Sequence, residues 1–301
     1  MPRVLDQDEI DQFQRDGFLS FLSNVPPAEL KLIRDTLVEL HEKGTGFSEG
    51  AQFDAMGIDD GEEPRRFPQI LHPRSFATHL VRTEFFRTAH DIARQLLGDN
   101  VRFSADISLM KPARIGSPTP WHQDEAYHNP NFEYREVSFW LALQPTDQMN
   151  SCMAYIPGSH LGEVLTHDFP GGDSRVHALE CVDGFDPRAA IVCPVPQGGC
   201  IIHAGRTLHF AGPNISDTDR YAYAVIFHLV PTPARQPREF PWRREQKTAR
   251  AEREKLWRRR GGLLVHLWRQ RSRMRLTNPA VLLADMRRAV AAVRQIRNPP
   301  R

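Results

Sequence analysis

The feature that most restricts the fold is the composition of residues 100–230. This region is a series of short runs rich in β-branched and aromatic residues, separated by clusters of Gly, Pro, Asn and Asp. The runs read VRFSADISLM, EVSFWLAL, CMAYIP, AAIVCPV, CIIH and YAYAVIFHLV. Many short strands joined by turns are typical of closed or two-sheet β folds. We therefore predict a double-stranded β-helix, the cupin-like jelly roll.

Helical patterns precede this β region, so the predicted fold class is mainly β with flanking α-helices. One acidic segment, DQDEIDQFQRDGF, ends at Gly17. A second, PPAELKLIRDTLVELHEKG, repeats Leu and Ile at helical spacing and ends at Gly44, and a third apolar pattern stops at Gly98. Residues 44–75 follow neither the helical nor the strand period, and we predict a long loop there.

A basic segment follows the β region. Residues 234–301 contain 20 Lys and Arg against 5 Asp and Glu, whereas acidic residues outnumber basic ones in residues 1–233. The stretch TNPAVLLADMRRAVAAVRQI offers Asn278 as a helix N-cap and Pro279 at the first helical position. We predict a basic helical C-terminal extension over 234–301, next to a β domain with its helical lead-in over 1–233.

The sequence does not favour a membrane-spanning or secreted protein. The N-terminal residues lack the apolar stretch of a secretory signal, and the longest apolar runs fall far short of the roughly 20 residues that cross a bilayer. The four cysteines are scattered without a CxxC pair. We expect a cytoplasmic protein, and its oligomeric state does not follow from the sequence.

The segment TPWHQDEAYH places His122 and Asp124 two positions apart. In a strand, residues i and i+2 project from the same face, so both side chains can bind one ion. A third ligand must come from elsewhere in the fold, and a late strand offers His203 and His209. Two imidazoles and one carboxylate form the facial triad of non-haem Fe(II) oxygenases, which leaves other coordination positions open.

These residues together resemble the phytanoyl-CoA dioxygenase family of Fe(II)- and 2-oxoglutarate-dependent oxygenases. The resemblance rests on the HxD pair, a distal His, and an Arg eleven residues after that His. The stretches LMKPARIGSPTPWHQDEAYH, CMAYIPGSHLGEVLTHDFP and HAGRTLHFAGPNISDTDRYA also look like stretches of the family, in the expected order. The resemblance covers most of residues 5–230, which makes residues 1–233 the oxygenase domain and leaves the basic extension outside it.

The resemblance implies the roles of the central residues. His122, Asp124 and His209 correspond to the iron ligands, and His203 to a residue next to them or to a co-substrate contact. Arg220 corresponds to the residue that binds the distal carboxylate of 2-oxoglutarate. This task suits a planar guanidinium, which binds a carboxylate through two parallel hydrogen bonds and stays charged.

One position departs from the family pattern. Family members often have Ser two positions after the distal His, where this chain has Ala211. Either one hydroxyl contact to the co-substrate is missing, or Asn214, Ser216 or Lys111 compensates for it.

The resemblance also implies the reaction and its participants, which are Fe(II), 2-oxoglutarate, O2 and a small organic substrate. We expect hydroxylation of an unactivated C–H bond in an acyl thioester or a natural-product intermediate, with release of succinate and CO2. Because this chain has Asp124, where the related halogenases have a small residue that makes room for halide, hydroxylation is favoured over chlorination. Desaturation and ring formation are not distinguished from it. The neighbours of the HxD pair, Trp121, Tyr127 and His128, are candidate substrate contacts.

Two other functions remain open on the sequence alone. The first is a non-catalytic metal-binding jelly roll, which has no use for a carboxylate-binding Arg220. The second is an interaction protein that acts through its basic extension, either at a membrane surface or on a nucleic acid. Trp257 and Trp268 lie beside arginines and suit such contacts, but they equally suit ordinary packing. We do not favour a nucleic-acid partner.

Overall fold

The computed structural model describes residues 4–59, 64–115 and 117–262. The chain divides into two compact units, residues 1–257 and residues 258–301, and every described strand and α-helix lies in the first. The helix predicted from Asn278 onward lies outside the described residues. Among the helices that are described, none is long and apolar enough to cross a lipid bilayer.

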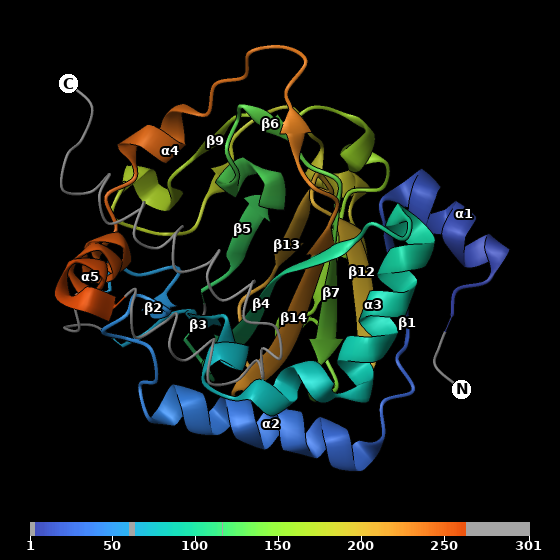
Figure 1. Cartoon of the computed structure of the whole chain (residues 1–301), viewed down its shortest axis with the longest axis horizontal. Coiled ribbons are helices and arrows are strands. Elements are labelled where there is room, and N and C mark those ends of the chain that lie inside the picture. The colour runs from blue at the N-terminus through green and yellow to red at the C-terminus, as the bar shows by residue number, and fades with distance from the viewer. Residues whose placement is uncertain (1–3, 60–63, 116, 263–301) are drawn as a thin grey trace, which may run out of the picture. The chain divides into compact units, whose positions relative to one another are not determined.

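Two antiparallel sheets form the β part of the fold (Figure 1). The strands of the larger sheet are β1 (Phe18–Leu22), β2 (Gln52–Asp54), β3 (Pro68–Leu71), β4 (Arg102–Lys111), β7 (Glu136–Ala142), β12 (Gly199–Ala204) and β14 (Arg220–His228). Those of the smaller sheet are β5 (Thr119–His122), β8 (Met153–Tyr155), β11 (Ile191–Cys193) and β13 (His209–Ala211). The larger sheet has the order β1-β12-β7-β14-β4-β3-β2, and the smaller has the order β11-β8-β13-β5.

Two short strand pairs complete the β structure: β6 (Phe132–Glu133) with β15 (Thr232–Pro233), and β9 (His167–Asp168) with β10 (Glu180–Cys181). The described helices are α1 (Gln7–Asp16), α2 (Pro27–Glu42), α3 (Glu84–Leu97), α4 (Pro241–Glu245) and α5 (Ala249–Trp257). The prediction of a double-stranded β-helix with N-terminal helices is confirmed.

Strand β14 shows how the alternation of its side chains builds two cores. Tyr223 and Phe227 point to the outer face of the larger sheet and join the core beneath the helices. Ala222 and Ala224 point to the inner face, where they pack with residues of the smaller sheet such as Met153. Because successive side chains in a strand point to opposite faces, one apolar strand contributes to both layers.

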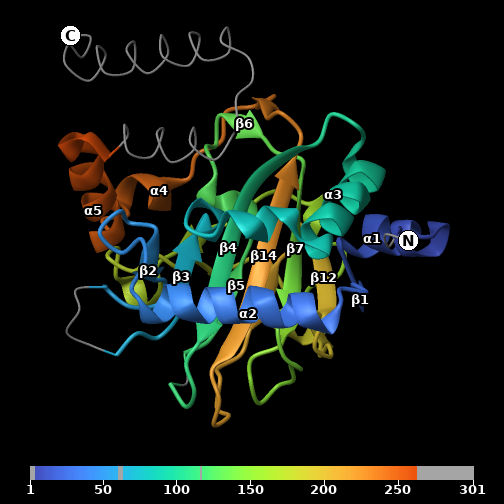
Figure 2. The ribbon, with the colours of Figure 1, turned by 60° about the horizontal axis from the view of Figure 1, so that its bottom comes forward.

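Helices α2 and α3 lie across the outer face of the larger sheet (Figure 2). Apolar residues on their inner sides, including Ile33, Leu37 and Ile92, are fully buried against it. Helix α1 ends where predicted, because Gly17 adopts a φ of 82° and its N–H bonds to the carbonyl of Phe13. A left-handed residue at this position suits glycine, and it redirects the chain into β1.

The prediction of a long loop over residues 44–75 is wrong in two places, because β2 and β3 extend the larger sheet there. They are too short to show a period in the sequence, and β3 is specified by its pairing with β4. Asp54 fixes the connection between them. Its carboxylate accepts hydrogen bonds from the backbone N–H groups of Arg66 (2.7 Å) and Phe67 (2.8 Å).

The residues after the last large strand pack against the β domain. The indole of Trp242 donates to the carbonyl of Ala126 (2.9 Å), and Arg238 pairs with the buried carboxylate of Glu125 (2.7 Å). In α5, Arg253 pairs with Asp59. The first compact unit therefore continues through the predicted boundary after residue 233 as far as Trp257.

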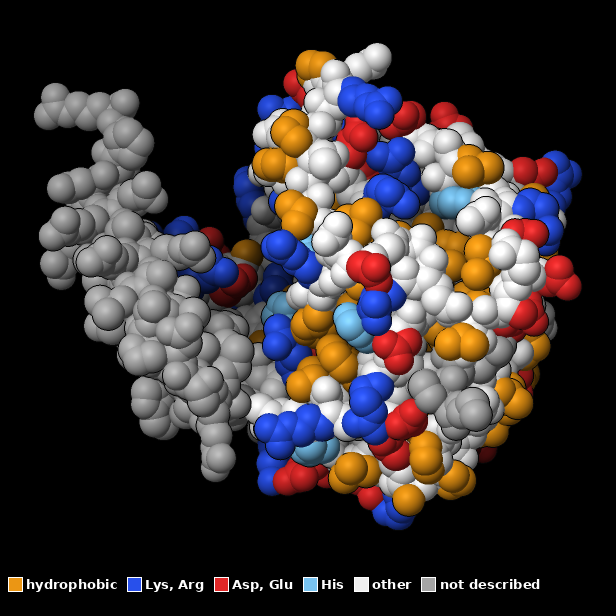
Figure 3. All heavy atoms as spheres, turned by 45° about the vertical axis from the view of Figure 1, so that its right-hand side comes forward, with side chains coloured by type: hydrophobic (Ala, Val, Ile, Leu, Met, Phe, Trp, Pro, Cys, Tyr) orange, Lys and Arg blue, Asp and Glu red, His pale blue; other side chains and the backbone are white. Residues whose placement is uncertain are grey.

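Charges of both signs are mixed on the surface of this unit. On the face shown in Figure 3, basic, acidic and apolar side chains are interspersed. Several exposed charges form pairs within one element or across a turn, such as Arg94 with Asp99 at 2.6 Å. Pairs of this kind contribute little stability in water.

Candidate active site

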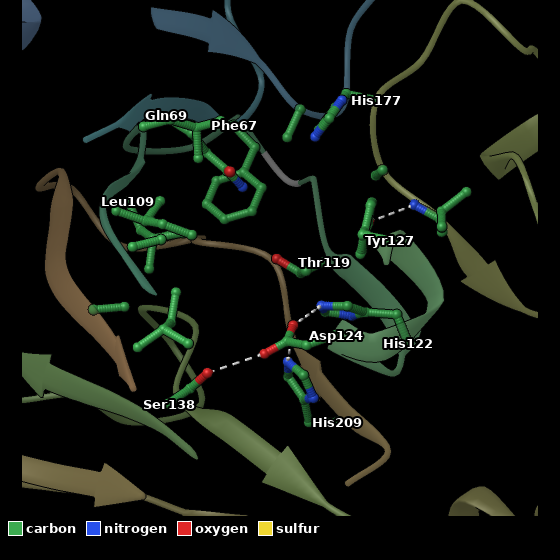
Figure 4. Close-up of a pocket in the computed structure, with 18 of the residues that line it drawn as sticks. Phe67, Gln69, Leu109, Thr119, His122, Asp124, Tyr127, Ser138, His177 and His209 are labelled. Atoms are coloured by element: carbon green, nitrogen blue, oxygen red, sulfur yellow. Dashed lines mark hydrogen bonds and ion pairs between the residues drawn. The ribbon is translucent and has the colours of Figure 1, made fainter. Parts of the chain in front are cut away.

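A cavity of about 510 Å³ lies between the two sheets. Its walls come from both sheets, from the loop before β10 and from the segment after β15. Most of the lining is apolar, with a cluster of His and Asp side chains on one wall (Figure 4). A cavity with few, convergent polar groups is typical of a small-molecule site.

The structure brings His122, Asp124 and His209 together on this wall. One possible ligand atom of each lies within 4.8 Å of the other two, and both imidazole Nε2 atoms are 3.7 Å from Asp124 Oδ1. Strands β5 and β13 pair with His122 directly opposite His209. The antiparallel ladder itself therefore sets the two imidazoles side by side, with ring centroids 4.1 Å apart.

Asp124 reaches the cluster by a different local structure from the one predicted. Strand β5 ends at His122, and Asp124 begins the 3₁₀ turn η3 (Asp124–Tyr127), so the expectation that both lie in a strand is wrong. Gln123 between them is still extended, with φ −116° and ψ 132°, which keeps its two neighbours on one side. The Gln123 side chain points away from the cluster, where its amide donates to the carbonyl of Arg206 (2.8 Å).

Both imidazoles are oriented for metal binding. The Nδ1 atom of His122 lies 2.8 Å from the carbonyl of Pro120, and that of His209 lies 2.9 Å from the carbonyl of Thr207. A carbonyl accepts, so the ring proton of each His belongs on Nδ1 and the Nε2 lone pair faces Asp124. Metal-binding histidines are commonly held in this way.

The pKa shifts of His122, His209 and Asp124 agree with metal binding by these three side chains. Burial lowers the pKa of His122 and, more strongly, that of His209, so both rings are neutral at physiological pH. Burial by itself raises the pKa of Asp124, but the nearby imidazoles of His209, His203 and His122 outweigh it and lower that pKa. Two neutral imidazoles and one carboxylate fit a divalent ion of the Fe(II) type.

The second oxygen of Asp124 is occupied by protein groups. His203 Nε2 lies 3.1 Å from Oδ2, and the hydroxyl of Ser138 donates to the same oxygen at 3.2 Å. His203 also contacts the hydroxyl of Tyr155 through Nδ1, at 3.2 Å. His203 therefore lies beside the three-residue cluster and holds its carboxylate. Ser138 was not predicted, although its inward position on β7, between Val137 and Phe139, marks it as a residue facing the smaller sheet.

Arg220 is the first residue of β14 and is almost fully buried, at 1% exposure. Its Nη2 donates to the hydroxyl of Ser151 (3.2 Å), and its guanidinium lies over the ring of Trp140. Its Nε and Nη1 atoms have no hydrogen-bond partner among the described residues, although Arg220 lines the cavity. Burial lowers its pKa to about 10, which leaves it charged at neutral pH. Two buried donor atoms that have no partner among the described residues, on a charged group, fit the carboxylate of a ligand.

Lys111 and Asn214 are occupied by the protein backbone. The ammonium of Lys111 donates to the carbonyls of Ser117 (2.8 Å) and Gly212 (3.3 Å). The amide of Asn214 donates to the carbonyls of Lys111 and Thr218, both at 2.9 Å. Neither residue belongs to the cavity lining, whereas Ala211 does. Ser216 bonds to Asn214 in the same loop.

The three candidate substrate contacts differ in position. Tyr127 and His128 line the cavity, whereas Trp121 does not. Trp121 stacks instead on Phe210, with ring centroids 5.2 Å apart. His128 lies 2.7 Å from the Glu136 carboxylate, which outweighs burial and raises the pKa of this His.

Several lining residues come from the C-terminal segment, where the sequence carried no site motif. Trp242, Arg243, Gln246 and Arg250 all contribute to the cavity wall. His177 lies opposite the Asp124 wall in Figure 4, and burial lowers its pKa to about 3. Only the packing of the C-terminal segment on the β domain reveals that Trp242, Arg243, Gln246 and Arg250 line the cavity.

The comparisons with known proteins agree with one another: the matches are named as dioxygenases or were solved with 2-oxoglutarate. A family model for phytanoyl-CoA dioxygenase (PhyH) matches residues 13–222. EvdO2 from Micromonospora carbonacea var. aurantiaca, solved in complex with 2-oxoglutarate, is 30% identical, with a TM-score of 0.69 over 80% of this chain and 98% of that one.

Two curated relatives extend the comparison. A Stutzerimonas stutzeri protein named "Probable alpha-ketoglutarate-dependent hypophosphite dioxygenase" is 30% identical over 167 residues, which span 54% of this chain and 57% of that protein. The phytanoyl-CoA dioxygenase domain-containing protein 1 of Danio rerio is 24% identical over 75% of this chain and 90% of its own length.

Proposed function

The chain belongs to the phytanoyl-CoA dioxygenase family and is an Fe(II)- and 2-oxoglutarate-dependent dioxygenase, and we propose that it hydroxylates an unactivated C–H bond of a small organic molecule. Succinate and CO2 are the co-products of this reaction. The single observation that carries the proposal is that Arg220, with two buried N–H groups lacking partners among the described residues, lines the same cavity as the His–Asp–His cluster.

In this proposal His122, Asp124 and His209 would hold the iron, and the bound iron would supply the oxidising chemistry of the reaction. Arg220 binds the distal carboxylate of 2-oxoglutarate through its Nε and Nη1 groups. His203 and Ser138 hold Asp124 Oδ2, which leaves Oδ1 facing the Nε2 atoms of His122 and His209, where a metal would bind. The apolar remainder of the cavity orients the substrate and excludes water from the reacting groups.

For the substrate we keep the two classes expected from the sequence, an acyl thioester or an intermediate of a natural product. A cavity of about 510 Å³ with a mostly apolar lining suits the apolar portion of either one. The hypophosphite in the name of the Stutzerimonas stutzeri relative is a much smaller, inorganic anion. Tyr127 and His128 are the proposed substrate contacts next to the His–Asp–His cluster, whereas Trp121 does not line the cavity.

Substitution of Arg220 tests the proposal against a metal-binding protein without catalysis. Under anaerobic conditions, Fe(II) and 2-oxoglutarate added to the wild-type protein should give the absorption band of the chelate. In Arg220→Leu the 2-oxoglutarate affinity should fall by about 100-fold or more, because one partner of a buried charge pair is lost. Fe(II) binding should persist in this variant.

Two outcomes contradict the proposal. One is a wild-type protein that binds Fe(II) but shows no 2-oxoglutarate band. The other is an Arg220→Leu chain that binds 2-oxoglutarate as tightly as the wild type does. A Leu variant that has lost Fe(II) binding as well points to damage of the fold, and Arg220→Lys then replaces it as the test, because Lys keeps the charge without the two-pronged geometry.

For the compartment we propose the cytoplasm, since all four cysteines are free thiols buried in the structure. A peripheral membrane contact of the basic extension stays part of this proposal. It concerns mainly residues beyond 262, which lie outside the described part of the chain.

A further inference from the structure

Thr119, the first residue of β5, carries a hydroxyl group at the wall of the cavity. Its Oγ1 atom is buried and makes no hydrogen bond with any residue in the described part of the chain. The side chain lines the cavity and lies close to the Asp124 wall (Figure 4). A buried hydroxyl that faces a cavity without a partner is a candidate contact for whatever fills that cavity.

An irregularity in the ladder explains why Thr119 faces the cavity at all. Thr119 and His122 are three residues apart, and in a regular strand they face opposite sides. Across the ladder, however, His122 pairs with His209 and Thr119 pairs with Ala211, so β5 holds one extra residue. This is the count of a β-bulge, and Pro120, which has no N–H group to donate, suits such a site. Both side chains thereby reach the same face.

The partner of Thr119 in the ladder is the position that departs from the family pattern. Family members often have Ser two residues after the distal His, and this chain has the methyl group of Ala211, buried at 1% exposure. Because directly paired residues lie side by side on one face of a sheet, a hydroxyl at 119 stands next to the place where the family hydroxyl is missing.

The guanidinium of Arg220 approaches the same place from the larger sheet. Its Nη2 donates to the hydroxyl of Ser151, and that hydroxyl donates to the carbonyl of Gly212 (2.5 Å), the residue after Ala211. The Ser151 hydroxyl therefore connects Arg220 to the residue directly after the strand that pairs with Thr119. The unpartnered groups in this part of the cavity are Arg220 Nε, Arg220 Nη1 and Thr119 Oγ1, as far as the described residues show.

We propose that Thr119 positions the co-substrate: its hydroxyl donates a hydrogen bond to the distal carboxylate of 2-oxoglutarate bound by Arg220, and it replaces across the β5–β13 ladder the hydroxyl that is absent at residue 211. This proposal rests on the proposed function of the site. It assigns the compensation to Thr119 and not to Lys111, Asn214 or Ser216, whose polar groups serve the backbone or one another.

The test is the dissociation constant of 2-oxoglutarate, measured by anaerobic titration of the absorption band in the Fe(II)-loaded protein. Thr119→Val keeps the shape and removes the hydroxyl, and it should weaken binding by about 10- to 100-fold, the range of a lost hydrogen bond to a charged group. Thr119→Ser keeps the hydroxyl and should stay within about threefold of the wild type. Fe(II) affinity should be unchanged in both variants. In the Thr119→Val background, Ala211→Ser should recover most of the lost affinity.

Wild-type affinity in Thr119→Val overturns the proposal, and so does a Thr119→Val/Ala211→Ser chain that binds as weakly as Thr119→Val alone. Thermal unfolding of each variant shows whether the fold is intact. If Thr119→Val is unfolded, Thr119→Ala takes its place with the same two expectations. A wild-type protein that binds no 2-oxoglutarate is a separate result, which removes the proposed function itself.

Discussion

At the scale of single residues, the site depends on how one carboxylate divides its contacts. Asp124 Oδ1 faces the two Nε2 atoms at 3.7 Å, and Oδ2 accepts from Ser138 while it lies 3.1 Å from His203. The division arises from four strands, because β5, β7, β12 and β13 each bring one of these groups to the inner faces of the sheets. Residues that hold a metal ligand in place often matter nearly as much as the ligand.

Ser138→Ala tests this arrangement. Without its hydroxyl, Asp124 loses one of the contacts on Oδ2 and gains freedom to rotate, so Fe(II) affinity should fall by about 10-fold. The measurement is a competition titration against a chelator of known affinity. Ser104→Ala is the matched control, because Ser104 lines the same cavity without bonding to Asp124. Equal Fe(II) affinity in Ser138→Ala and the control contradicts the role of Ser138.

At the scale of elements, helix α2 is attached to the larger sheet by a buried polar contact as well as by apolar packing. His41 lies 2.9 Å from the hydroxyl of Ser108 on β4, and only 7% of His41 is exposed. Burial lowers the pKa of His41 to about 4. In the unfolded chain a histidine has a pKa of about 6.5.

This difference predicts a pH dependence of stability. Between pH 6.5 and 4 the unfolded chain binds a proton at His41 that the folded chain does not, so the free energy of unfolding falls as the pH falls. The shift corresponds to up to about 3 kcal/mol for this group. In His41→Gln this contribution is absent. The free energy of unfolding of the wild type, relative to that of the variant, should therefore fall as the pH is lowered from 7 to 4. Urea unfolding of the metal-free proteins at several pH values measures this free energy. If it changes with pH in the same way in both proteins, His41 does not make the predicted contribution.

At the scale of the whole molecule, the segment after the family domain completes the cavity. The family match ends at residue 222, but Trp242, Gln246 and Arg250 line the cavity. Trp242 packs in a small buried cluster with Phe240 and Ala126. Because this wall lies outside the matched domain, we expect it to distinguish the substrate of this chain from those of its relatives.

Trp242→Ala tests how firmly the segment is held. Loss of a buried indole and of its hydrogen bond to Ala126 should lower the free energy of unfolding by about 3 to 5 kcal/mol, the usual cost of such a cavity. Leu256→Ala is the control, because Leu256 is 48% exposed and its substitution should change stability by about 0.5 kcal/mol or less. Denaturant unfolding of both variants gives the comparison. A Trp242→Ala chain as stable as the control contradicts the inferred packing of the segment.

The sequence alone was sufficient for features that have a local cause. Helices α1 and α3 end at Gly17 and Gly98 as predicted. Strands β4, β7, β8, β11, β12 and β14 lie where the β-branched and aromatic runs predicted them. The pairing of His122 with Asp124 was visible too, because two residues at close spacing face one point whenever the residue between them is extended. These signals lie within a few residues of one another and need no information about distant partners.

Only the tertiary structure decided how distant segments meet. It brought His209 opposite His122 and turned His203 toward Asp124 Oδ2, an arrangement that the sequence indicated only through the family resemblance. It also formed β2 and β3 from a stretch without periodicity, and it placed Thr119 beside Ala211 through a bulge. Such contacts depend on strand register across the sheets. A register is selected because one face of each strand must be buried against other segments, and a pattern of a few residues does not say which distant segments these are.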